Sequence, residues 1–394
     1  MKRFWLCAVL GCAAGMAGAL DFGFVLDQTP GWNSEDKFFY DAAVSGWFSM
    51  FVGDNAQLYT SVKGIAKYRN TSWSDNPGPV VFDVGRFEFS YRPLPWLSLN
   101  VGRQYFRDSA EVVVSGLVDG ASLSLGIGPT TLSAGIFYTG LLYKNTANIT
   151  LTSDDSGILV DTNEYFASRR LLASARWVFP GQMNTLTLDG LAQIDLNDRP
   201  DKVNSQYISL QYALRTKNWW TFTPAVVVGF AQDPKAASAF TFAAGINMDW
   251  DIPKGLNDRF SFKVWTGSGS FRDTIAAFRP ITGASQGRIL DANLSGLIMA
   301  RVGYTLRIFS IISLGAEFSY FARTDFKTVT SGSSLDTTKG YLLGGEYFAN
   351  MTVAPTSDLT FVLSGGSFLP GLGDAFIAGT PDLWKIALQA ILAF

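Results

Sequence analysis

The feature that most constrains this chain is a regular alternation of apolar and polar side chains over unusually long runs. Within residues 238–251, for example, Phe240 and Phe242 alternate with Thr241. Successive side chains of an extended strand point to opposite faces, so each run predicts a strand with one apolar and one polar face. Strands of soluble sandwiches are commonly about five or six residues long, whereas roughly 9 to 11 tilted residues are needed to cross the hydrocarbon of a membrane. The length of the runs therefore favours strands that span a membrane.

The composition of the chain agrees with this interpretation. Only 16% of the residues are charged and 47% are hydrophobic, whereas a typical soluble domain is roughly 25% charged. After residue 20 the chain has no apolar run of roughly 18 residues, which a membrane-spanning helix would need. The apolar residues must therefore contact lipid from strands.

Eighteen runs can be counted, and sixteen is the alternative count if the short first run is misassigned. Short turns rich in glycine and proline alternate with longer polar connections between the runs. Short turns at one end and longer loops at the other are typical of outer-membrane barrels. The predicted fold is an all-β, transmembrane, antiparallel up-and-down β-barrel of about 18 strands, formed by one domain over 20–394. The runs are 20–26, 39–51, 56–69, 80–92, 97–107, 114–126, 130–141, 165–178, 185–196, 204–215, 220–231, 238–251, 259–269, 291–306, 311–322, 340–353, 359–369 and 383–394.

Residues 1–19 have the pattern of a secretory signal. Lys2 and Arg3 precede an apolar stretch, and Ala17-Gly18-Ala19 has the small-x-small form of a cleavage site. We expect a cleaved signal peptide, with a lipoprotein signal ending at Cys12 as the alternative. Cleavage after Ala19 would remove both cysteines, leaving a mature chain without thiols.

The last run carries the most specific signal. In residues 384–394 the apolar side chains alternate, and the chain stops at Phe394. This segment resembles the C-terminal strand of bacterial outer-membrane β-barrels, and the whole pattern resembles the porins among them. The resemblance implies that Phe394 is an assembly signal read by the barrel-assembly machinery, and that the protein resides in the cell outer membrane with lipid as its surroundings.

A shorter match points in the same direction. Gly102-Arg103-Gln104, followed by residues 116–120, resembles strand segments of substrate-type porins. Arg103 departs from the pattern, because strict alternation would direct its side chain toward lipid. We expect a β-bulge or a side chain that reaches the rim to accommodate it.

Several classes of function are excluded by residue inventory. The chain has no histidine, the usual general base at neutral pH and a common zinc ligand, so we expect no enzyme, no cofactor and no metal. The net charge of −2 and the pI of about 5.3 argue against binding nucleic acid. One acidic cluster in a long loop could bind calcium, but a solvated loop is the preferred interpretation, since the spacing is not that of an EF-hand. This cluster comprises Asp154, Asp155, Asp161 and Glu164.

A barrel of this size encloses an aqueous channel, because wall side chains alone do not fill it. The side chains that alternation directs inward include twelve basic and six acidic residues, so we expect a mild preference for anions. The alternative is that these charges pair across strands and cancel. The basic set is Lys63, Lys67, Arg86, Arg92, Arg170, Arg176, Arg215, Arg259, Lys263, Arg301, Arg307 and Lys385, and the acidic set is Glu88, Asp189, Asp195, Asp249, Glu317 and Glu346.

A loop folded into the lumen should narrow the channel, and 142–164 and 270–290 are the two candidates. The second would contribute Arg272, Arg279 and Arg288. The alternative is that both loops stay outside.

The leading function is a porin for passive diffusion of small hydrophilic solutes. The alternatives are a substrate-specific transporter and an adhesin or structural barrel with an occluded lumen. Gly344-Gly345 and Gly365-Gly366 would allow the close contacts of a homotrimer.

Overall fold

The computed structural model describes residues 20–69, 72–73, 80–161, 163–199, 202–232, 239–253, 255–270, 276–329, 335–336, 338 and 340–394. The predicted signal peptide at 1–19 lies outside these residues.

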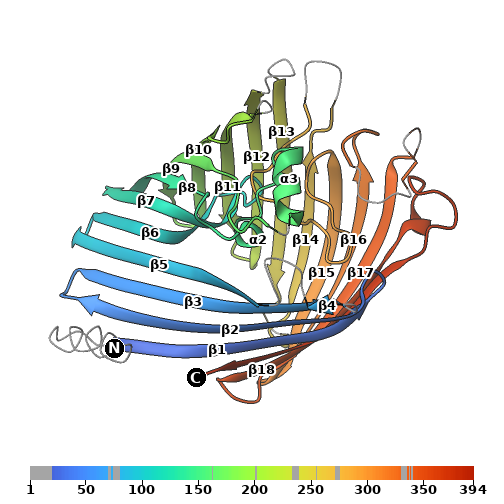
Figure 1. The fold of residues 1–394 in the computed structure, drawn as a ribbon, viewed down its shortest axis with the longest axis horizontal. Helices are drawn as coiled ribbons and strands as arrows, with labels where there is room; N and C mark the ends of the chain where they lie inside the picture. The colour runs from blue at the N-terminus through green and yellow to red at the C-terminus, as the bar shows by residue number, and fades with distance from the viewer. Residues whose placement is uncertain are drawn as a thin grey trace.

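The described residues form a closed antiparallel β-barrel with eighteen wall strands, as predicted (Figure 1). Each strand pairs with its neighbour in the chain, and β1 pairs with β19 to close the ring. A two-residue strand, β4 (Ser72–Trp73), pairs antiparallel with the last two residues of β3. The wall strands are β1 (Leu20–Asn33), β2 (Lys37–Val52), β3 (Ala56–Arg69), β5 (Val80–Leu94), β6 (Leu97–Arg107), β7 (Ser115–Ile127), β8 (Thr130–Tyr138), β9 (Arg170–Pro180), β10 (Asn184–Asp195), β11 (Asn204–Arg215), β12 (Trp220–Gln232), β13 (Ala239–Asp251), β14 (Arg259–Gly267), β15 (Leu297–Phe309), β16 (Ile312–Arg323), β17 (Leu342–Val353), β18 (Leu359–Leu369) and β19 (Leu383–Ala393).

The period-two pattern sets the two faces of the wall. On β11, Ile208 and Leu210 are 64% and 49% exposed, while the intervening Ser209 is 3% exposed. The exposed apolar side chains point outward, and the small and polar ones point into the lumen. The alternation in the sequence therefore separates a lipid-compatible surface from a polar interior.

The first strand is longer than predicted. The sequence pattern predicts a short strand that ends at Leu26, and Pro30, which lacks a backbone donor for a ladder, follows four residues later. In the structure β1 continues to Asn33, and its pairing with β19 skips Thr29 and Pro30 while keeping the same register on both sides. The strand tolerates the lost donor because β2 pairs with it along its whole length.

Two other predicted strands start too early. Residues 291–296 and 165–169 belong to loops that enter the lumen, and their strands begin at Leu297 and Arg170. Leu290 and Leu294 are nearly inaccessible. In the segment before β15, apolar residues that would suit a strand facing lipid are instead buried inside the ring.

The two ends of the barrel differ. Two residues connect β5 to β6 and β7 to β8, and the first and last strands end beside each other at the same rim, where Phe24 and Phe394 exchange backbone hydrogen bonds. The longer connections lie at the opposite end and contain two short helices, α2 (Lys144–Ala147) and α3 (Ser153–Val160), and the 3₁₀ turn η1 (Pro370–Leu372). Among the described residues, no helix has the length and apolar character to cross a membrane.

Candidate functional site: a lumen lined by inward loops

The main apolar core lies inside the barrel, where three chain segments meet. Ile281 donates its N–H to the Val113 carbonyl at 2.7 Å, and Gly283 donates to the Asn148 carbonyl at 2.9 Å. Val113 and Ile281 are almost completely buried. The segments are the described residues of 108–114, 139–169 (without 162) and 268–296 (without 271–275), and we call them the first, second and third inward segments. Both loops predicted as constriction candidates therefore contribute to the lumen.

The second inward segment is held to the wall by a buried charge cluster. Arg170 on β9 is 0% exposed, and its Nη2 atom donates to both oxygens of Asp155 on α3, at 2.9 and 2.7 Å. The Arg170 Nη1 atom is 2.6 Å from Asp195 on β10. A buried charge requires partners of this quality. α3 is therefore fixed against β9 and β10 by one guanidinium.

This cluster changes the interpretation of the acidic loop. Asp155 is not solvated, because it is buried and binds Arg170 and the Ser168 hydroxyl. It also completes a capping box with Thr152 at the start of α3. The expectation of a solvated acidic cluster is therefore wrong for Asp155. Within the described residues, no group of histidine, cysteine, aspartate and glutamate side chains could hold a metal ion.

The third inward segment is held from the opposite wall. The carboxylate of Glu346, which is buried on β17, accepts the backbone N–H groups of Arg288, Ile289 and Leu290, each at 2.8 Å. The Arg288 side chain reaches Glu317 on β16 at 3.0 Å. The hydrogen bond to Glu317 raises the pKa of Arg288, so this guanidinium stays charged.

The first inward segment is held in a turn by hydrogen bonds from its own backbone to the carboxylate of Asp108. Asp108 accepts the N–H groups of Val113 and Val114 at 2.9 and 2.8 Å. Burial is the dominant influence on Asp108 and raises its pKa in spite of these bonds. Ser109 donates its N–H to Asp189 on β10, which also pairs with Arg176 at 2.6 Å.

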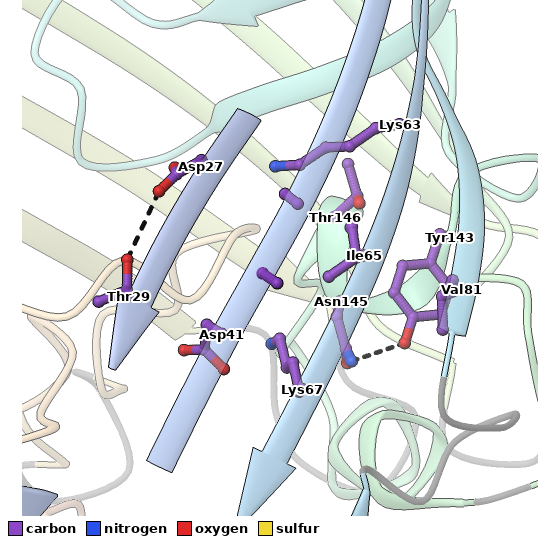
Figure 2. Close-up of a pocket in the computed structure, with 12 residues that line it drawn as sticks. Asp27, Thr29, Asp41, Lys63, Ile65, Lys67, Val81, Tyr143, Asn145 and Thr146 are labelled. Atoms are coloured by element: carbon purple, nitrogen blue, oxygen red, sulfur yellow. Dashed lines mark hydrogen bonds between the residues drawn. The ribbon is translucent and has the colours of Figure 1, made fainter. Parts of the chain in front are cut away.

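An open cavity of about 300 Å³ remains beside β1, β2 and β3. Lys63 and Lys67 project into it from β3, and Asp27 and Asp41 face it from β1 and β2 (Figure 2). The α2 side of the cavity is formed by Tyr143, Asn145 and Thr146. This cavity has both charge signs on neighbouring strands of the wall, with the lysines on β3 and the carboxylates on β1 and β2.

The remaining predicted pore residues are distributed over the wall. Arg86 and Glu88 form an ion pair on β5, and the Arg86 guanidinium stacks 4.7 Å from the Tyr59 ring. Lys263 and Arg301 are cross-strand partners on β14 and β15, and Arg301 is 3.7 Å from Glu317.

Three more predicted residues lie away from these pairs. Asp249 is on β13 opposite Ser261. Arg279 lines a cavity of about 570 Å³ with Lys327. Arg272 lies outside the described residues. The assignment of these side chains to solute contact stays a prediction.

Several wall and loop carboxylates were not predicted to matter. Asp41 lies within the predicted run 39–51, so the alternation signal was available for it, whereas Asp27 lies beyond the predicted end of the first run at Leu26. Asp83 and Asp119 both bind Arg103, at 3.3 and 2.8 Å. Arg103 follows Gly102, whose φ of +114° is disfavoured for other residues. The only sequence signal for this group was that Arg103 violated the alternation.

No protein-family model and no curated protein sequence matches this chain. Several solved structures share its fold. The Pseudomonas aeruginosa outer-membrane protein OpdK has a TM-score of 0.65 at 14% identity and covers 95% of this chain and 98% of its own. OccK2 (OpdF) of the same organism, in complex with glucuronate, has a TM-score of 0.62 at 13% identity over 95% and 98%. OccK11 (OpdR) has a TM-score of 0.59 at 10% identity over 95% and 96%. The barrel thus has the architecture of 18-stranded outer-membrane porins.

Proposed function

We propose that this protein is an outer-membrane channel through which small hydrophilic anions diffuse passively. The observation that carries the proposal is the cavity beside β3, inside a closed ring, with Lys63 and Lys67 on the same strand. Cationic side chains along a narrow aqueous path lower the energy of an anion in it and raise that of a cation. No catalytic step is included, since the chain has no histidine to act as a general base.

The inward segments favour a selective channel over a wide general one. Loops with a buried apolar core and anchored by Arg170 and Glu346 leave discrete cavities instead of one open tube. Structures of OpdK with vanillate and of OccK2 with glucuronate have this fold, and both ligands are carboxylates. We infer that small carboxylates are the class of solute to test first.

The decisive experiment is single-channel recording in a planar bilayer under a salt gradient. We expect stable conductance steps and a reversal potential whose sign indicates anion selectivity. The double variant Lys63→Glu/Lys67→Glu should move the reversal potential toward cations, whereas Lys217→Glu, on an exposed short turn, should not. A cation-selective wild type, or equal effects of both changes, would contradict the proposal. A folded barrel that never conducts would favour the occluded structural barrel.

The surroundings of the barrel follow from the same proposal. Outer-membrane lipid contacts the outward side chains, and the barrel-assembly machinery reads the strand that ends at Phe394. Closed trimers are a further element of the proposal, with Gly365 in a lipid-facing depression beside Ala316 and Ala349. Small side chains there allow a neighbouring barrel to approach closely.

A further inference from the structure

The barrel wall is not continuously hydrogen-bonded between β5 and β6. Pairing of these strands runs from Leu94 and Leu97 only as far as Phe87 and Arg103. Beyond Phe87, β5 bulges against Ser61 of β3 and continues to pair with β3 alone. The two strands separate in Figure 1. Residues 80–86 therefore form a sheet edge that faces β6 without backbone pairing to it.

Side chains replace the missing ladder. The Phe82 carbonyl accepts the Tyr165 hydroxyl, and the Val84 carbonyl accepts Arg103 Nη1 at 2.8 Å. In hydrocarbon every backbone polar group must be satisfied within the protein, so these bonds make the edge tolerable. A side chain can leave such a bond by rotating, whereas a strand ladder opens only when several backbone bonds break together. The seal at this point therefore depends on the side chains of Tyr165 and Arg103 instead of on a backbone ladder.

An apolar groove of about 580 Å³ lies over the outside of the seal. Phe82, Val62 and Val84 line it from the wall, and Leu141 and Phe166 line it from the second inward segment. Phe82 is 77% exposed. These side chains suit a hydrocarbon chain, because such a chain gains from apolar contact at any point along the groove.

The charged side chain of Arg103 lines the same groove. Arg103 lies six residues beyond Leu97, the start of β6, which places it near mid-depth at about 9 to 11 residues per crossing. It is bound to Asp119 and Asp83. An ionisable side chain at this depth is costly and is expected to serve a function.

The inside of the seal adjoins the lumen cavity. The Thr146 hydroxyl lines that cavity and donates to Asp83 at 2.7 Å, while Asp83 also lines the outer groove. Lys63 lines both spaces. The cavity and the groove are thus separated at this position by side chains of Asp83, Thr146 and Arg103.

We propose that the β5–β6 opening is a lateral port for an amphiphile with a carboxylate head and a hydrocarbon tail. The head binds near Lys63 and Lys67, and the tail lies in the groove over Phe82. The head is anionic because both cations of the cavity are on β3, which pairs with β5 along the edge of the opening. The carboxylates of the cavity already have partners, since Asp41 pairs with Arg69 at 2.7 Å and Asp27 accepts Gln389 Nε2 at 3.0 Å. The inference rests on the proposed placement in the outer membrane, but not on conduction of ions.

Photolabelling tests the port. The full protein, purified from an expressing outer membrane and placed in phosphatidylcholine nanodiscs, is irradiated with a diazirine analogue of dodecanoate and mapped by mass spectrometry. We expect saturable labelling of peptides that contain Phe82, Leu141 and Phe166. Dodecanoate should compete, and dodecyltrimethylammonium should not.

Matched variants locate the binding. Val84→Trp fills the groove and should reduce saturable labelling about tenfold, the effect of losing one good contact. Val226→Trp places the same ring on the lipid face of β12, which is paired on both sides, and should leave labelling unchanged. Lys63→Met should raise the half-competing concentration of dodecanoate by a similar factor.

Three results would overturn the proposal: labelling spread evenly around the lipid-facing belt, equal labelling in Val84→Trp and Val226→Trp, or equal competition by the cationic amphiphile. Conductance of the same preparation separates this inference from the proposed function. A barrel that is labelled in the groove but never conducts would remove the ion channel and retain the port. A conducting barrel without saturable labelling would remove the port and retain the ion channel.

Discussion

Replacing Arg170 with methionine should detach the second inward segment from the wall while leaving the barrel intact. The guanidinium is the cation shared by two buried carboxylates, Asp155 and Asp195. Removing one partner from a buried ion pair costs about 3 to 5 kcal/mol, since the remaining charge is left uncompensated. Each 1.4 kcal/mol is a factor of about ten, so the detached fraction should rise roughly one hundredfold to a few thousandfold.

The assay is single-channel recording combined with limited proteolysis. Arg170→Met should show larger or flickering steps and new cleavage within 142–164, because this segment fills part of the lumen. Asp154→Ala is the matched control on the same helix. Its partner Arg199 is 3.3 Å away, both side chains are 37–44% exposed, and such surface pairs contribute about 0 to 1 kcal/mol. Identical conductance and cleavage in the two variants would refute the argument that Arg170 holds the segment.

Three further predictions concern acid, assembly and association. Burial alone would raise the pKa of Asp325, but hydrogen bonds from the Thr328 hydroxyl and from three backbone N–H groups outweigh it and lower the pKa below 3.8. A carboxyl group whose pKa is lower in the folded than in the unfolded state adds stability at pH values above its unfolded-state pKa, and this stability is lost as the pH falls through its folded-state pKa. Pepsin should therefore cut near 325–328 increasingly on acidification, and Asp325→Asn should abolish that pH dependence. Phe394→Ala should reduce the heat-modifiable fraction recovered from outer membranes but scarcely affect refolding in detergent, because the bonds between Phe394 and Phe24 are made by backbone atoms; equal losses in both would argue against an assembly signal. Gly365→Trp should convert crosslinked trimers to monomers while Val226→Trp does not, and a wild type that crosslinks only as monomer would end the trimer proposal.

The wall could be predicted from sequence because its signal is local. Alternation within a single strand predicts which side chains face outward and which face inward. The outward position of Ile208 and the inward position of Ser209 can therefore be predicted without knowing which strand pairs with β11. The extension of β1 through Pro30 could not be predicted, because it depends on pairing with β2.

The lumen was less predictable because its contacts join distant parts of the chain. Alternation directs Asp189 and Asp195 inward, but it does not show that Asp189 binds the backbone of Ser109 or that Asp195 binds Arg170. The inward segments have no period that distinguishes a buried loop from an exposed one. Arg103 was the informative exception, since its conflict with the alternation coincides with the place where the wall ladder stops.

The division between wall and lumen has a consequence for how such a chain can diversify. Outward side chains are constrained only by contact with lipid. The eighteen strands form the closed barrel whatever residues the loops contain. The inward segments pack against one another and attach to the wall through a few side chains, chiefly Arg170 and Glu346. A transplanted loop that keeps these anchors could therefore give the same ring a different solute preference.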